Sequence, residues 1–229
     1  MLRRCFVAAI GLFASVNLAC AQSTPNQTPT AALLETLTPP ESMEKPRIGD
    51  HWNYEVRDQM TGELKQTYIA TVTDVSPAVL GATISYVGNF QNKYMTYDRS
   101  WNFLDNGDRR YTPNDGTGIQ GPLAVGKTWS IEGTETNNAT GETRKRLGSA
   151  KVTAKESITT RAGTFEAFKI ESSIEARYVN DPNMVDQDER QDWYVPAIDH
   201  WVKRIYLVRS GGRVSRNVSA ELIGYGRGP

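Results

Sequence analysis

The sequence has few cysteines and histidines, two of each. Cys5 and Cys20 both lie within the first 20 residues, which we expect to belong to a leader that is removed from the mature chain. The folded part would then hold no thiol at all. This excludes disulfide bonds, cysteine catalysis and cysteine-ligated zinc from the predicted domain.

An excess of charge of either sign is also lacking, since 26 basic residues face 26 acidic ones. Loss of Arg3 and Arg4 with the leader lowers the basic count from 26 to 24. A balanced charge gives no reason to expect a nucleic acid partner. We expect the short basic runs, residues 144–146 and 203–204, to lie on solvated strand faces.

Long apolar runs are missing too. The longest, residues 5–16, is shorter than the roughly 20 residues of a membrane span, so we predict no transmembrane span. A basic start, this apolar run and the small residues after it are typical of a secretory signal over residues 1–21. Cleavage after Ala21 would make the protein periplasmic or secreted. In the alternative, Cys20 carries a lipid that anchors the protein to a membrane.

The remainder divides into two parts. Residues 22–47 are rich in proline, serine and threonine, which predicts a disordered tether. From residue 48 to 229, apolar and polar residues alternate with a period of two, as in Trp52, Tyr54 and Val56, and turn-forming pairs separate these runs. We predict one all-β domain with little helix: a curved antiparallel sheet that forms a half-barrel or open barrel. The expected strands cover residues 52–56, 66–75, 82–87, 151–153, 164–178, 192–195, 201–208 and 214–225.

An internal repeat relates residues 48–73 to residues 125–153. Each copy begins with a glycine turn, continues with a strand led by Trp52 or Trp129, passes through Thr-Gly-Glu and ends in Val-Thr. Two copies are too few for a solenoid, so they predict two related halves of one sheet.

The segment GPLAVGKT, residues 121–128, matches the nucleotide-binding pattern G-x-x-x-x-G-K-[ST]. A phosphate-binding loop must be followed by a helix, whose N-terminus faces the anion. The following residues, WSIEGTET, are poor helix formers, and the other copy of the repeat has Gly49, Asp50 and His51 where this one has Gly-Lys-Thr. We therefore predict a turn before a strand and no bound nucleotide.

The two histidines raise the possibility of a metal site. His51 and His200 each lie in Asp-His-Trp, so they could join Asp50 and Asp199 as metal ligands or as a general base. Adjacent strand residues point to opposite faces, however. We therefore expect a turn aspartate, an exposed histidine and a core tryptophan in each motif, with no metal or other cofactor.

The acidic segment 181–192 could hold calcium, as could Asp105 and Asp108, but its spacing does not fit a calcium-binding loop. We expect a solvated hairpin loop. No G-x-S-x-G nucleophile motif is present, which favours a protein without enzymatic activity.

Aromatic residues are plentiful, with five tryptophans and ten tyrosines. Most should fill the core, and some could line a cavity if the sheet curves. The residues that we predict to bind a ligand there are Trp52, Tyr54, Trp129, Trp193 and Trp201.

Three further segments resemble an uncharacterised family of bacterial cell-envelope β-proteins. They are PLAVGKTW (122–129), RAGTFEAFKI (161–170) and WYVPAIDHWVKR (193–204). The resemblance covers residues 48–208 and implies a fold distantly similar to the half-barrels of periplasmic lipoprotein carriers. It implies no catalytic residues.

These observations together predict an exported cell-envelope protein that binds without catalysis. Its partner would be an apolar or amphipathic, lipid-like ligand or another envelope protein. Two alternatives remain: a metal-dependent hydrolase that uses His51 and His200, and a structural subunit that docks through sheet edges.

Overall fold

The computed structural model describes residues 42–89 and 91–228. The predicted signal, its Cys20 and nearly all of the predicted tether lie outside these residues. The chain divides into two units, residues 1–39 and 40–229, and the second holds all of the described structure.

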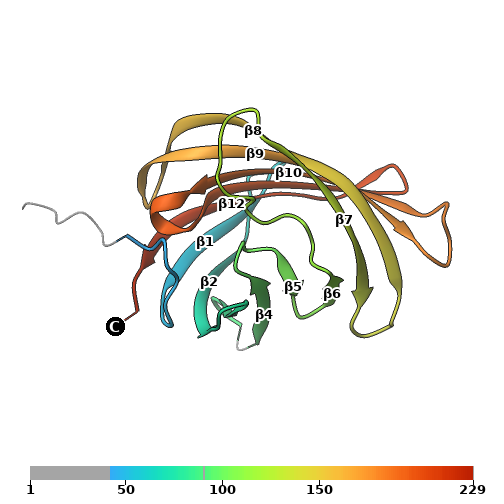
Figure 1. Cartoon of the computed structure of the whole chain (residues 1–229), viewed down its shortest axis with the longest axis horizontal. Helices are drawn as coiled ribbons and strands as arrows, with labels where there is room; N and C mark the ends of the chain where they lie inside the picture. The colour runs from blue at the N-terminus through green and yellow to red at the C-terminus, as the bar shows by residue number, and fades with distance from the viewer. Residues whose placement is uncertain (1–41, 90, 229) are drawn as a thin grey trace, which may run out of the picture. The chain divides into compact units, whose positions relative to one another are not determined.

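The second unit consists almost entirely of strands (Figure 1). A single turn of 3-10 helix, η1 (Pro196–Ile198), connects two of them. The strands are β1 (His51–Asp58), β2 (Leu64–Val75), β3 (Val79–Tyr86), β4 (Asn92–Asp98), β5 (Phe103–Asp105), β6 (Arg109–Thr112), β7 (Thr128–Asn137), β8 (Thr143–Thr160), β9 (Gly163–Tyr178), β10 (Val185–Val195), β11 (His200–Ser210) and β12 (Arg213–Gly226).

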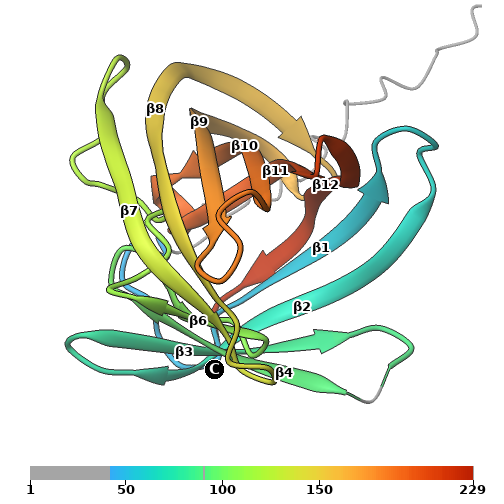
Figure 2. The same ribbon diagram turned by 90° about the vertical axis from the view of Figure 1, so that its right-hand side faces the viewer.

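These strands form a closed antiparallel barrel in which each strand pairs with its neighbours in the sequence. Strand β1 pairs with β2 on one side and, over its full length, with β12 on the other (Figure 2). The prediction of an all-β curved antiparallel sheet with little helix is confirmed. The sheet closes into a complete barrel, whereas a half-barrel or open barrel was expected. Closure also removes the free edges on which the docked-subunit alternative depended.

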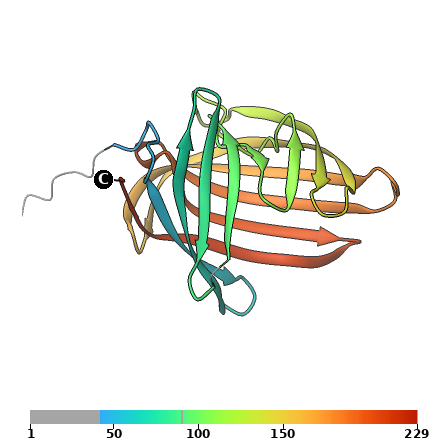
Figure 3. The same ribbon diagram turned by 90° about the horizontal axis from the view of Figure 1, so that it is seen from below.

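The barrel has one weak seam, at β5. This strand has three residues, and it pairs with β6 only between Asp105 and Arg110. The long β6–β7 connection supports the seam, because Phe103 and Asp115 exchange hydrogen bonds of 2.8 and 3.0 Å. In Figure 3 the blue-green and green strands that precede the seam run across the direction of the orange and red strands near the C-terminus.

The two segments of the sequence repeat have the same local geometry. Gly49 and Gly126 both have φ 91°, a left-handed conformation that favours glycine. Their amides donate to Val72 O and Val152 O respectively, both at 2.8 Å. The same turn therefore precedes β1 and β7.

Residues 121–127 form the end of the β6–β7 connection, and strand β7, not a helix, begins at Thr128. The ammonium group of Lys127 donates to the carbonyl oxygens of Gln120 and Pro122, the latter at 2.9 Å. The prediction of a turn before a strand is confirmed. Lys127 thus holds its own loop together.

The interior of the barrel is divided along its axis into an apolar half and a charged half. Near the end that holds η1, aromatic and aliphatic side chains fill the interior. We call this filling the aromatic core; its buried members include Trp52, Tyr54, Trp101, Trp201, Val202 and Leu222. The other half of the interior, towards the β7–β8, β9–β10 and β11–β12 turns, is lined by charged side chains.

Candidate ligand-binding cavity

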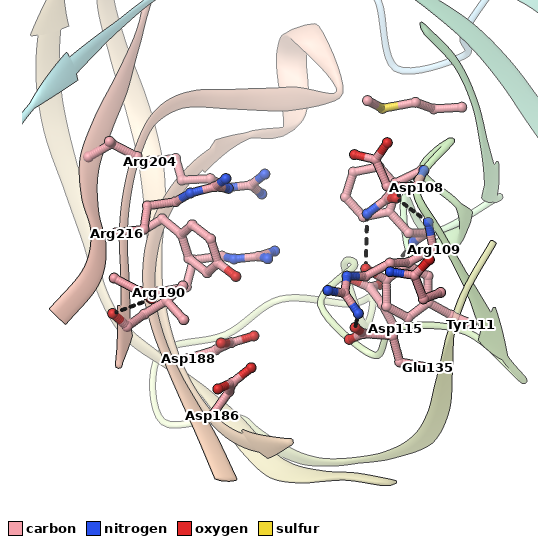
Figure 4. Close-up of a pocket in the computed structure, with 18 of the residues that line it drawn as sticks. Asp108, Arg109, Tyr111, Asp115, Glu135, Asp186, Asp188, Arg190, Arg204 and Arg216 are labelled. Carbon is pink, nitrogen blue, oxygen red and sulfur yellow. Dashed lines mark hydrogen bonds and ion pairs between the residues drawn. The ribbon is translucent and has the colours of Figure 1, made fainter. Parts of the chain in front are cut away.

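The charged half of the interior contains a cavity of about 930 Å³ (Figure 4). Every strand except β9 contributes to its lining. Val56, Met95 and Phe103 line the cavity and also pack against the aromatic core, so they form its apolar floor. The walls are polar: eight lining residues are Lys or Arg and five are Asp or Glu.

Charged residues enter the barrel because they occupy alternate positions on strands. On β8, Arg144 and Arg146 are buried and line the cavity, whereas Lys145 between them is exposed. The expectation of a solvated face for residues 144–146 is wrong for both arginines. Closure of the sheet turns one face of every strand inward, whatever its polarity.

The same alternation corrects the interpretation of the acidic segment 181–192. Strand β10 begins at Val185, and Asp186 and Asp188 are buried and line the cavity. Gln187 and Glu189, at the alternate positions, are exposed. The expected solvated hairpin loop is therefore confined to the residues before Val185.

Glu135 lies at the centre of a buried ion-pair network. Its carboxylate is 1% exposed and contacts Arg109 at 2.7 Å, Arg146 at 2.8 Å and Arg144 at closer range. Burial favours its neutral form, but Arg144, Arg146 and Arg109 hold the pKa of Glu135 below its ordinary value. Glu135 is therefore ionised.

Two aspartates of β10 complete this network. Asp186 pairs with Arg144, and Asp188 lies 3.6 Å from Arg146. Three arginines thus face three carboxylates, so the network carries no net charge.

The opposite wall, which β10, β11 and β12 form, has a different character (Figure 4). The guanidinium carbons of Arg190 and Arg216 lie 5.2 and 5.8 Å from the centroid of the Tyr206 ring. The Nε and Nη1 atoms of Arg190 are shielded from solvent, yet they have no hydrogen-bond partner in the described part of the chain. Burial opposes its charge, but Asp192 and other acidic groups raise the pKa of Arg190 above the usual value, so it remains a cation.

Arg204 links this wall to the aromatic core. It pairs with Asp192, and its guanidinium lies 3.8 Å from the centroid of the Trp201 ring. This contact fits a cation–π interaction.

None of the five residues predicted to bind a ligand lines the cavity. Trp52 is 1% exposed and donates to Ile198 O at 3.2 Å, and the Tyr54 hydroxyl donates to Trp201 O at 2.6 Å. These hydrogen bonds satisfy the polar atoms of Trp52 and Tyr54 inside the core.

The other predicted residues also have structural contacts. Trp129 is partly buried and packs against a second apolar cluster that includes Ile131 and Val152. Trp193 donates to Glu156 at 2.6 Å.

The two histidines lie in separate surroundings. His200 is 2% exposed, and its ring centroid is 3.8 Å from that of Trp201 and 4.2 Å from that of Trp52. Burial, with a smaller contribution from Arg204, lowers the pKa of His200 well below its ordinary value, so the ring is neutral. The prediction of an exposed histidine is wrong here. His51 lies with its Nδ1 atom 3.1 Å from Gly49 O.

Asp50 and Asp199 also have their own partners. Asp50 is fully buried and accepts from Arg227 at 2.9 Å. Asp199 accepts from Trp101 at 3.0 Å and Tyr194 at 2.6 Å, and burial raises the pKa of its carboxyl to about 6. Within residues 42–89 and 91–228, no group of three or more His, Cys, Asp or Glu is placed to hold a metal ion. No helix among them is long and apolar enough to cross a membrane.

Residues 120–202 match the model of a family described as DUF3108-like. This segment contains the AGTF and WYVP motifs on which the predicted resemblance rests, and it supplies the Arg144, Asp186 and Arg190 side chains of the cavity. No curated protein matches the sequence.

Solved structures are similar to the barrel. A putative lipoprotein from Parabacteroides distasonis aligns with a TM-score of 0.51 and 16% identity, over 80% of this chain and 98% of its own. A putative exported protein with a YmcC-like fold from Bacteroides fragilis gives 0.47 and 13%, over 79% and 97%. The hypothetical lipoprotein YmcC from Escherichia coli gives 0.45 and 8%, over 82% and 87%. The first alignment shows that the fold is shared.

Proposed function

We propose that this protein is an exported binding protein of the cell envelope, without enzymatic activity, that holds an amphipathic ligand inside its barrel. The observation that carries the proposal is the cavity of about 930 Å³, with its apolar floor and charged walls. Its volume lies within the range of small-molecule sites, about 300–1,000 Å³. An apolar ligand segment on the floor and a polar group at the wall would match both surfaces.

The chemistry of the lining supports binding over catalysis. The lining residues, all within the described part of the chain, include neither histidine nor cysteine. The carboxylates of Glu135 and Asp186 are engaged in ion pairs with arginines, which favours a structural role for them. The hydrolase alternative has less support, because His51 and His200 each have their own surroundings.

Export is part of the proposal and rests on residues 1–21, whose basic start and apolar run are typical of a secretory signal. The mature protein would be periplasmic or secreted. A lipid on Cys20 would instead hold the barrel at a membrane, with residues 22–47 as its tether.

Binding of an uncharged apolar probe, N-phenyl-1-naphthylamine, tests the cavity itself. We expect saturable fluorescence enhancement with one probe per barrel, and its loss in Val218→Trp, because Val218 lines the cavity and a tryptophan there would occupy it. Val214→Trp is the matched control: Val214 lies on the same strand, is 52% exposed and is not part of the lining.

Equal binding by both folded variants would show that the probe binds elsewhere. Absence of saturable binding by the unmodified protein would contradict the proposal. An envelope protein would then be the better candidate partner.

A further inference from the structure

Ion pairs neutralise nearly all charged side chains of the cavity. Glu135, Asp186 and Asp188 balance three arginines, as described above. Further pairs join Lys93 to Asp108, Lys65 to Glu63 and Arg204 to Asp192. Three charged lining residues have no ion pair in the described part of the chain: Arg190, Arg216 and Asp115.

The Asp115 carboxylate already accepts hydrogen bonds from other groups. Its carboxylate accepts from the backbone amides of Phe103 at 2.8 Å and Thr117 at 3.2 Å, and also from the Thr117 hydroxyl. These bonds fix the β6–β7 connection. In the described part of the chain no ion pair joins Asp115 to either arginine, although its charge is among those that raise the pKa of Arg190. The wall around Tyr206 therefore carries an excess of positive charge.

The register of the sheet places the two arginines around one ring. Arg190 of β10 pairs directly with Tyr206 of β11, and Arg216 of β12 pairs with Val208, two residues further along β11. Residues two apart on a strand share a face, so all of these side chains point inward. The guanidinium carbons of both arginines lie close to the Tyr206 ring, 5.2 and 5.8 Å from its centroid. Figure 4 shows Arg190 and Arg216 on the same wall of the cavity.

The unpaired guanidinium nitrogens can donate hydrogen bonds to a ligand. A guanidinium carries five N–H groups and no acceptor, and its fork geometry suits the two oxygens of a carboxylate or phosphate. Within residues 42–89 and 91–228, two shielded nitrogens of Arg190, Nε and Nη1, have no hydrogen-bond partner. Leaving such donors unsatisfied costs free energy, which an incoming acceptor would recover.

We infer that Arg190, Tyr206 and Arg216 form a subsite for the oxyanion head group, phosphate or carboxylate, of the ligand. This inference rests on the proposed function, since the cavity floor would hold the apolar part of the same molecule. Val218 pairs with Tyr206 in the sheet and lines the cavity beside the subsite, so a chain attached to the head group would meet an apolar surface at once.

Calorimetric titration at low ionic strength tests the subsite with four probes: decyl phosphate, decanoate, decanol and inorganic phosphate. We expect both anionic amphiphiles to bind at least about tenfold more tightly than decanol. Arg190→Gln and, separately, Arg216→Gln should each remove most of this difference and leave decanol binding unchanged. Arg213→Gln is the matched control, because Arg213 is exposed on the same strand and does not line the cavity.

The outcomes separate the two proposals. Equal affinity for decanol and the anions, or anion binding that survives both Arg190→Gln and Arg216→Gln, would overturn the oxyanion subsite and leave the binding protein intact. Inorganic phosphate that binds as tightly as decyl phosphate, and depends on Arg190, would support the subsite and contradict an amphipathic ligand. If no probe binds, both proposals are wrong. Because Arg216 is exposed, its variant remains informative if the Arg190 variant fails to fold.

Discussion

Trp52 and Trp129 occupy equivalent positions of the repeat but differ in what surrounds them. Trp52 is enclosed by Trp101 and His200 in the aromatic core. Trp129 is only partly buried and contacts Gly116 O at 3.4 Å on the β6–β7 connection. We therefore expect the two tryptophans to contribute unequally to the free energy of unfolding.

We predict that Trp52→Ala costs about 3–5 kcal/mol of unfolding free energy, as expected for a fully buried large side chain. Trp129→Ala should cost about half as much, and Lys127→Ala less than about 1 kcal/mol, since its contacts are exposed loop carbonyls. Urea denaturation monitored by circular dichroism measures all three. A Lys127 variant more damaging than the Trp52 variant would contradict this ranking.

Asp199 is the residue whose ionisation should most clearly affect stability. Burial raises its folded pKa from 3.8 to about 6, so the folded state favours the neutral acid. Its contribution to stability is therefore complete below about pH 4 and is lost as the pH rises through 6.

We predict that the stability of the unmodified protein relative to Asp199→Asn falls by about 2–3 kcal/mol between pH 4 and 7. The variant stays neutral at every pH, which makes it the proper reference. Urea unfolding at unit steps of pH provides the measurement, with exposed Asp181→Asn as control. A difference that does not change with pH would show that Asp199 ionises normally.

At the scale of the strand, sequence patterns succeed where the inward residues are apolar. Strands β1, β2, β9 and β12 were predicted because their alternating positions carry aromatic or aliphatic side chains. Strand β10 was predicted only at its apolar end, residues 192–195, and β4–β6 were missed. On β10 the inward positions carry Asp186, Asp188 and Arg190. Their period of two was visible in the sequence, but charge alone does not show which face a closing sheet turns inward.

The buried network on β7 and β8 gives a prediction with an internal control. Glu135→Gln removes the negative charge that faces Arg144 and Arg146, and should cost about 3 kcal/mol, because a buried charge without its partner is strongly destabilising. Glu132→Gln on the same strand is exposed and should change stability by less than about 0.5 kcal/mol. Equal effects in thermal or urea unfolding would mean that the network is not formed in solution.

The seam at β5 predicts uneven local stability. Strands β8 and β9 are paired along their whole length, whereas β5 and β6 share one residue pair. Amide hydrogens of residues 103–112 should therefore exchange at least about tenfold faster than those in the centre of β8 and β9. Hydrogen exchange followed by mass spectrometry would contradict this if the two regions were equally protected.

At the scale of the whole barrel, closure is the feature that the sequence did not reveal. Pairing between β1 and β12 joins segments about 170 residues apart. No local pattern encodes that contact. It creates the interior, in which Trp52 and Tyr54 lie in the aromatic core and charged residues line the cavity. None of the five predicted residues lines that cavity, and the proposed ligand contacts come from its charged and apolar residues.

Native mass spectrometry of the protein, produced from its full sequence in its own organism, tests the central claim most directly. We predict a one-to-one adduct with the mass of an amphipathic molecule that carries a phosphate or carboxylate. The adduct should be retained in Val214→Trp, weakened in Arg190→Gln and absent in Val218→Trp. A protein of bare mass, or an adduct equally abundant in Val218→Trp, would contradict the account.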